Sequence, residues 1–205
     1  LPGLQQAATG SGSVTFAGDA DGIVRKVPLL LRQRGQLLPA LSLEALRVAQ
    51  GAGAIVVKTS DGSGNLGGGR AEHDVVSVKV GSFEVPTTES GALWMHSPGP
   101  QPQRVVPAWK ILSGAVPKER MAELFGGHIV FVGAGAVGLR DLVSTPLQDR
   151  ELGVMLHAQA AEQMILGRFL VRPDWAAGLE RALVLALGAV LLLLLPGLGA
   201  IRGAA

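Results

Sequence analysis

Short apolar runs alternate with amphipathic stretches through residues 1–175 of the chain. The runs are rich in Val, Ile and Leu and are bounded by turn-forming residues, a pattern typical of strands separated by turns. The run at 128–132 is almost continuously apolar and precedes a glycine, which predicts a strand buried on both faces. Together the runs predict strands over residues 23–31, 54–57, 75–80, 83–85, 92–95 and 128–132.

Apolar residues at helical spacing predict the helices. Leu41, Ala45 and Val48 recur at this spacing, which indicates a helix over residues 39–50 that Gly51 ends. Strands mixed with helices predict an α/β or α+β fold, with a mixed β-sheet and flanking helices. Further helices are expected over residues 107–112, 117–125 and 153–166.

The C-terminal part has a different pattern, because residues 182–201 contain no charged side chain. An α-helix needs about 20 apolar residues to cross the hydrocarbon layer of a membrane. Trp175 and Arg181 precede the stretch, as interfacial anchors of a span do. Pro196 and Gly197 would kink or end the helix. A buried helix is the alternative, but a 205-residue chain offers no core large enough to surround it.

We therefore expect a folded domain over residues 1–175, followed over 176–205 by a transmembrane helix and the start of the next segment. Basic residues lie mostly before this helix, and charge counting alone would place the domain inside the cell. Leu1 opens the chain without the pattern of a signal peptide, so both ends are expected to continue in a longer protein.

Composition excludes several classes of function. The chain has no cysteine, which excludes disulfides, thiolate nucleophiles and cysteine-ligated zinc. The 18 basic and 16 acidic side chains form no basic stripe, and aromatics make up only 4 %, so no nucleic-acid partner is expected. No catalytic triad order, P-loop or pair of catalytic carboxylates is present, and we expect no enzymatic activity of this chain.

The sequence Gly133-Ala-Gly135-Ala-Val-Gly138 fits the G-x-G-x-x-G fingerprint of dinucleotide sites. In such sites a long helix follows the glycines, yet Pro146 comes soon after them. A structural interpretation, in which the glycines form a turn of small residues, is favoured. No cofactor is therefore expected. The alternative is a membrane-anchored, nucleotide-binding oxidoreductase that uses these glycines.

Metal sites receive little support. Asp61, Ser63, Asn65 and Glu72 match a calcium loop only in part, because Leu66 stands where the loop requires glycine. The spacing of the histidines is not that of paired metal ligands, and no metal is expected. The histidines are His73, His96, His128 and His157.

Four residues at or before the expected helix 153–166 are candidates for ligand binding. Arg140, Asp141 and Thr145 lie in the polar loop after the apolar run 128–132, where open sheets often bind ligands. His157 follows on the helix and titrates near neutral pH. The alternatives are structural: Arg140 can pair with Asp141, and a hydrogen bond can hold His157 at the helix start.

Several short blocks follow one another in a fixed order over residues 10–173, and the first block contains Asp19-Ala-Asp21-Gly22 and Arg25. Together these blocks resemble the second of the CHASE families, the cyclase- and histidine-kinase-associated sensory extracellular domains. The family pattern departs at Met155, where an acidic residue is usual, and at His96, where an aromatic is usual. The later blocks are residues 39–45, 83–86, 126–133, 138–141, 145–146, 153–158 and 165–167.

The resemblance implies a sensory domain on the periplasmic side of the bacterial cytoplasmic (inner) membrane, which overrules the charge count. It implies several transmembrane helices after the domain and a cytoplasmic nucleotide cyclase, kinase or diguanylate cyclase. The expected partners are the membrane, an unknown small-molecule or protein signal, and a second copy of the chain in a homodimer. A purely structural module that scaffolds oligomers is the remaining alternative.

Overall fold

The computed structural model describes residues 2–61, 73–135, 141–173 and 175–202. The chain divides into two compact units, and each is considered by itself. The first contains residues 1–58 and 75–171, and the second contains residues 59–74 and 172–205. In chain order the first unit includes α1 (Pro2–Ala7), β1 (Lys26–Pro28), β2 (Leu30–Gln33), β3 (Gln36–Pro39), α2 (Leu41–Ala49), β4 (Ile55–Thr59, which ends in the second unit), β5 (Val75–Val80), β6 (Phe83–Pro86), β7 (Ala92–Trp94), η1 (Pro102–Arg104), α3 (Ala108–Leu112), α4 (Lys118–Phe125), β8 (Leu142–Val143), β9 (Glu151–Leu152) and α5 (Gly153–Leu166).

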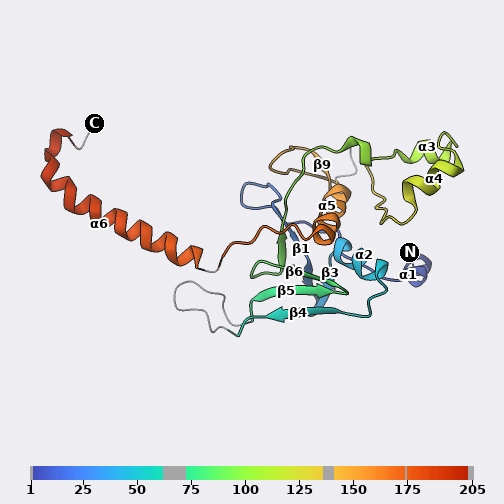
Figure 1. Cartoon of the computed structure of the whole chain (residues 1–205), viewed down its shortest axis with the longest axis horizontal. Coiled ribbons are helices and arrows are strands. Elements are labelled where there is room, and N and C mark those ends of the chain that lie inside the picture. Colours follow the sequence, from blue (N-terminus) through green and yellow to red (C-terminus); the bar gives the residue numbers. More distant parts are fainter. Residues whose placement is uncertain (1, 62–72, 136–140, 174, 203–205) are drawn as a thin grey trace. The chain divides into compact units, whose positions relative to one another are not determined.

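The predicted combination of strands and helices is confirmed, and the described strands are distributed over small sheets (Figure 1). β4, β5 and β6 form one sheet, while β1 pairs with β7, β2 with β3 and β8 with β9. The registers of β1–β7, β2–β3, β5–β6 and β8–β9 are all antiparallel. Turns after a few residues keep these strands short, as at Gly81 and Gly91, which both have positive φ.

The β2–β3 hairpin was missed by the sequence analysis, which expected the chain to enter a helix at Pro39. Gln33 pairs with Gln36, so Arg34 and Gly35 alone form the turn. Their φ values of 50° and 81° are the positive angles that a two-residue hairpin turn requires. The sequence evidence for this hairpin was weak because arginine is not a typical residue for such a turn.

The hydrophobic core lies where α2 and α5 pack against each other and against the strands (Figure 1). α2 contributes Leu43 and Leu46, and α5 contributes Ala160 and Met164, all at most 2 % exposed. α3 and α4 contribute no buried residue. The strands supply the remainder of this core, from Val27, Leu29, Val78, Val80, Val85 and Leu93.

The expected strand at residues 128–132 is wrong. The segment has no strand conformation, and Val130 and Val132 are 49 % and 88 % exposed. Ile129 alone of these three packs against the core. A run of apolar residues shows that burial would be favourable, but burial on both faces also needs neighbouring strands on both sides.

α5 begins and ends where the sequence predicted, at Gly153 and Leu166. Gly167 follows it with a φ of 64°, the left-handed conformation in which helices commonly end. In the second unit, α6 (Ala176–Arg202) continues past Pro196 and Gly197, so of the two expected effects, a kink or an end of the helix, these residues do not produce the end. Within α6, residues 176–195 have a mean hydropathy of 2.2 and are long and apolar enough to cross a membrane.

Candidate functional site

The start of α5 is held by the β8–β9 hairpin that precedes it. β8 and β9 pair through Leu142–Leu152 and Val143–Glu151. Directly beyond this ladder, the amide of Gly153 donates a hydrogen bond of 2.8 Å to the carbonyl of Asp141. The hairpin therefore brings the loop residue Asp141 to the first residue of the helix.

The space around Gly153 is tight. A methyl group at its Cα would lie 2.3 Å from Oδ1 of Asp141 and 3.2 Å from Cε2 of Phe16. The carboxylate of Asp141 thus lies against the N-terminus of α5, where the helix dipole stabilises a negative charge. Glycine permits this close approach of carboxylate, ring and helix.

His157 lies one helical turn after Gly153 and is 1 % exposed. Its ring packs against the ring of Phe16, with centroids 4.6 Å apart and planes tilted by 34°. Neither ring nitrogen has a hydrogen-bond partner at bonding geometry in the part of the chain that the structure describes. A buried imidazole without such partners is costly, and it becomes more costly when protonated.

The surroundings of His157 favour its neutral form. Burial lowers the pKa of His157, and this effect outweighs the main chain of Val14 and the negative charge of Asp141, which act in the opposite direction. At this site, the carboxylate of Asp141 favours the protonated form of His157, but burial of the ring disfavours that form more strongly.

The four residues predicted to bind a ligand have different surroundings. Asp141 and His157 are both at the start of α5, as described above. The Thr145 hydroxyl donates to the carbonyl of Gln148 at 3.2 Å and accepts from its amide at 3.1 Å, within a local turn. Arg140 lies outside the described residues. A ligand contact of any of the four stays a prediction.

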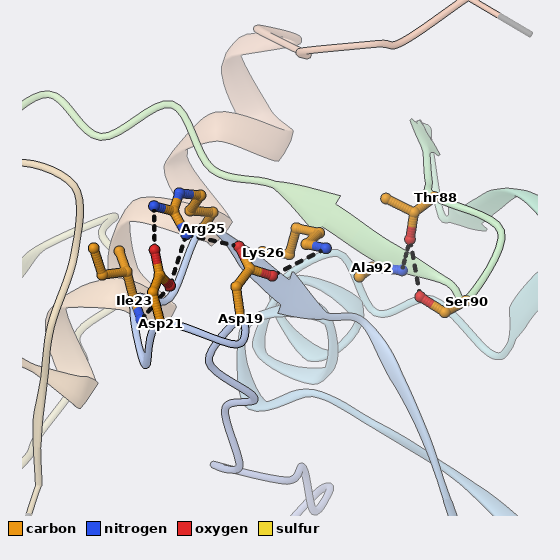
Figure 2. Close-up of polar contacts among 8 residues, drawn as sticks. All are labelled: Asp19, Asp21, Ile23, Arg25, Lys26, Thr88, Ser90 and Ala92. Atoms are coloured by element: carbon orange, nitrogen blue, oxygen red, sulfur yellow. Dashed lines mark hydrogen bonds and ion pairs between the residues drawn. The ribbon is translucent and has the colours of Figure 1, made fainter. Parts of the chain in front are cut away.

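A second polar cluster forms around Arg25, in the loop before β1 (Figure 2). The guanidinium forms two hydrogen bonds with the carboxylate of Asp21, of 2.8 and 3.0 Å, and a third of 3.0 Å with Asp19. Lys26 pairs with the other oxygen of Asp19 at 3.2 Å, and the amide of Ile23 donates to Asp21 at 3.0 Å. Figure 2 also shows Thr88 holding the turn that leads into β7.

The charges of this cluster satisfy each other. Hydrogen bonds from Arg25, and then from the Ile23 amide, lower the pKa of Asp21 to about 2. Bonds from Arg25 and Lys26 lower the pKa of Asp19, and the two carboxylates raise the pKa of Arg25. The sequence analysis noted the block that contains these residues, but not the ion pairs, because pairing depends on side-chain direction within the loop.

The Arg25 loop and the β8–β9 hairpin are joined by main-chain hydrogen bonding. Ile23 and Ser144 form a parallel bridge, in which the amide of Val24 donates to the carbonyl of Ser144 at 2.8 Å. Segments far apart in the sequence therefore meet beside the start of α5.

The glycine motif receives no support as a nucleotide site. A methyl group on Gly133 would lie 2.4 Å from Cβ of Val154, and one on Gly135 would contact Leu152 at 3.5 Å. Gly133 therefore permits close packing against the start of α5, whereas the contact at Gly135 would be an ordinary one. Gly138 lies outside the described residues, and the chain next described forms β8 instead of a long helix.

The structure describes too little of the calcium-like loop to test it, since Ser63, Asn65, Leu66 and Glu72 lie outside the described residues. Among the described residues no group of three or more His, Asp or Glu side chains could hold a metal ion. Glu151 is a buried acid that the sequence analysis missed, and burial raises its pKa.

The fold and its polar clusters define an α+β domain followed in the chain by a helix of membrane-spanning length. A family model, the CHASE2 domain, matches residues 2–197, and the chain belongs to this family. The suspected resemblance is thereby confirmed, and the match extends beyond residue 173 into α6. No curated protein and no solved structure matches the chain significantly.

CHASE2 domains are extracellular sensory domains typical of signalling receptors, and they are not catalytic. Membership of the family gives the domain a sensory role, and no finding supports the oxidoreductase alternative.

Proposed function

We propose that the chain is the periplasmic sensory part of a bacterial receptor in the cytoplasmic membrane. In this proposal α6 is a transmembrane helix, and the receptor's output is a cytoplasmic nucleotide cyclase or protein kinase. The observation that carries the proposal is the family match over residues 2–197, which includes both the sensory fold and most of α6.

The properties of α6 support its assignment to the membrane. Residues 176–195 are apolar, and none of the apolar window is buried by the rest of the protein. In water such a helix would expose a long row of leucines, for example Leu192 and Leu193 at 75 % and 81 %. Lipid removes this cost, because transfer of apolar surface out of water is favourable by about 25 cal/mol per Å².

α5 supports a route for the signal along the chain. It carries core residues, begins at the Asp141–His157 cluster and ends at Gly167, and residues 168–175 connect it to α6. A signal that binds one conformation of α5 better than another shifts the population between them, by no more than its difference in affinity. We propose that a small molecule or a protein supplies this difference, and that the receptor is a homodimer.

The absence of cysteine allows a direct test of the orientation. Lys118→Cys places one thiol on the exposed surface of α4. The full-length receptor with this change is expected to react with a membrane-impermeant maleimide in intact spheroplasts. Labelling only after the cytoplasmic membrane is permeabilised would contradict the periplasmic location, and the parent receptor, with any cysteine outside this chain replaced, reports background labelling.

A further inference from the structure

A half-open pocket lies along the second half of α5, between this helix and the segment that leaves β7. Its volume is about 140 Å³. The polar side chains that line it are His96, Gln101, Arg104, Gln159, Glu162 and Arg168, together with the clamp residue described next. No residue of this pocket was among the candidates from the sequence.

The back of the pocket is fixed by Gln163, which is 5 % exposed. Its amide nitrogen donates to the carbonyl of Trp94 at 2.8 Å, and its amide oxygen accepts from the amide of His96 at 2.9 Å. One side chain thus replaces two main-chain hydrogen bonds at the end of β7 and ties that strand to α5. Both polar ends of Gln163 are thus engaged with the main chain, so this side chain fixes the shape of the pocket.

One side of the pocket is closed by an ion pair between Arg104 and Glu162. Glu162 raises the pKa of Arg104, so this arginine stays charged and its charge is compensated. The acid and the arginine therefore cancel, and neither attracts a charged ligand strongly.

Four polar side chains of the pocket form no side-chain hydrogen bond or ion pair within the described residues, namely His96, Gln101, Gln159 and Arg168, and the last two match an anion best. Arg168 is exposed and forms no ion pair with any residue that the structure describes. Gln159 is 8 % exposed, and its amide makes no side-chain hydrogen bond within the described ranges. Gln159 lies one turn before the Gln163 clamp on the same face of α5. A guanidinium and an amide facing one small space match the paired oxygens of a carboxylate.

We propose that this pocket binds a small organic carboxylate, with Arg168 holding the carboxylate and Gln159 donating to its oxygens. This deepens the proposed function by naming the chemical class of the signal. The volume is below the roughly 300 Å³ of pockets for drug-sized ligands, which restricts the ligand to a short acid. Arg168 directly follows Gly167 at the end of α5, so the bound carboxylate acts on the first residues of the connection to α6.

The test uses the full chain in lipid nanodiscs, with acetate, succinate and L-glutamate as probes and acetamide and succinamide as uncharged controls. At least one acid is expected to bind saturably with a Kd of about 1 mM or tighter, measured by calorimetry, and to raise the thermal midpoint. Its amide is expected to bind at least about tenfold more weakly, because a charged hydrogen bond is lost.

Arg168→Gln is the decisive variant, since its side chain is exposed and its loss leaves the core intact. It is expected to weaken binding by at least about tenfold, while Arg150→Gln, an exposed arginine outside the pocket, binds as the parent does. The proposal is overturned if no acid binds at about 10 mM, or if both variants bind equally.

The two proposals fail independently. Binding in nanodiscs does not depend on which side of the cell membrane the domain occupies. Correct surface labelling without carboxylate binding would remove only the pocket's assignment. Binding by a domain that labels as cytoplasmic would remove the receptor topology and leave the pocket.

Discussion

The two ends of α5 differ in how deeply their polar side chains are buried. At the start of the helix, Asp141 and His157 are packed against Gly153 and Phe16, with the imidazole 1 % exposed. In the second half, polar side chains surround a half-open space of about 140 Å³. We call the start of α5, with Asp141 and His157, the closed end, and its packing is suited to fix the helix. We call the second half, with the pocket, the open end, and its polar side chains remain available to a ligand. A sequence pattern of His and Asp does not distinguish these roles, because they depend on burial.

If the closed end fixes the helix, removing its packing should have the largest effect. Leu156 is 1 % exposed, and Leu156→Ala is expected to lower the free energy of unfolding by about 2–5 kcal/mol, since it leaves a cavity. Ile165→Ala, at 47 % exposure near the open end, should change it by less than about 0.5 kcal/mol. Urea unfolding of the full chain in nanodiscs measures both. Equal losses would abolish the contrast between the ends.

The close approach at Gly153 gives the next largest effect. Gly153→Ala is expected to cost about 1–3 kcal/mol, because the added methyl group overlaps Asp141 and Phe16. Gly53→Ala is the matched control, as its new methyl group would meet no atom within 4 Å. Thermal unfolding of both variants separates the steric effect from the general effect of replacing glycine. A Gly153→Ala protein as stable as the control would show that the closed end can relax.

The histidine at the closed end predicts a dependence of stability on pH. Because burial lowers the pKa of His157 in the folded protein, the unfolded chain binds the proton first as the pH falls below about 6.5. Stability is therefore lost from this pH downward to the folded pKa, by at most about 1.4 kcal/mol per pH unit, and is unaffected by His157 above it.

Comparison with variants isolates this contribution from that of the acids. Between about pH 6.5 and 5, the free energy of unfolding of His157→Gln should fall by less than that of the parent, as measured by denaturant titrations at each pH. His128→Gln, which changes an exposed histidine, should follow the parent. Parallel pH profiles for His157→Gln and the parent would show that the ring is protonated at no cost.

Local patterns predicted the fold better than the site. α5 and β5 have the predicted bounds, because periodicity and a terminal glycine act within a few residues. The strand at 128–132 was wrong because its burial depends on neighbours distant in the sequence. Asp141 was predicted from its place in the loop after the expected strand 128–132, and His157 from its place on the helix that follows. The structure has no strand there, yet it brings the two residues together at the start of α5. The role of Gln163 could not be predicted from the sequence, since it depends on hydrogen bonds to Trp94 and His96, which are distant along the chain.

The smallest effect concerns Arg25, which contrasts with Arg168 in one respect. Both are exposed to some degree, but Arg25 is fully paired with Asp19 and Asp21. Arg25→Gln should lower the thermal midpoint by less than Gly153→Ala does, because an exposed ion pair contributes little. The difference from the parent should shrink at about 1 M salt, where surface charges are screened.

The same variant also tests whether free charge, and not arginine as such, defines the open end. Carboxylate binding should be unchanged in Arg25→Gln, since Arg25 lies outside the pocket and its charge is already compensated by two carboxylates. Calorimetry with the acid that the parent binds best decides the point. A weakening equal to that of Arg168→Gln would mean that the net charge of the domain attracts the ligand, and the pocket would lose its specific role.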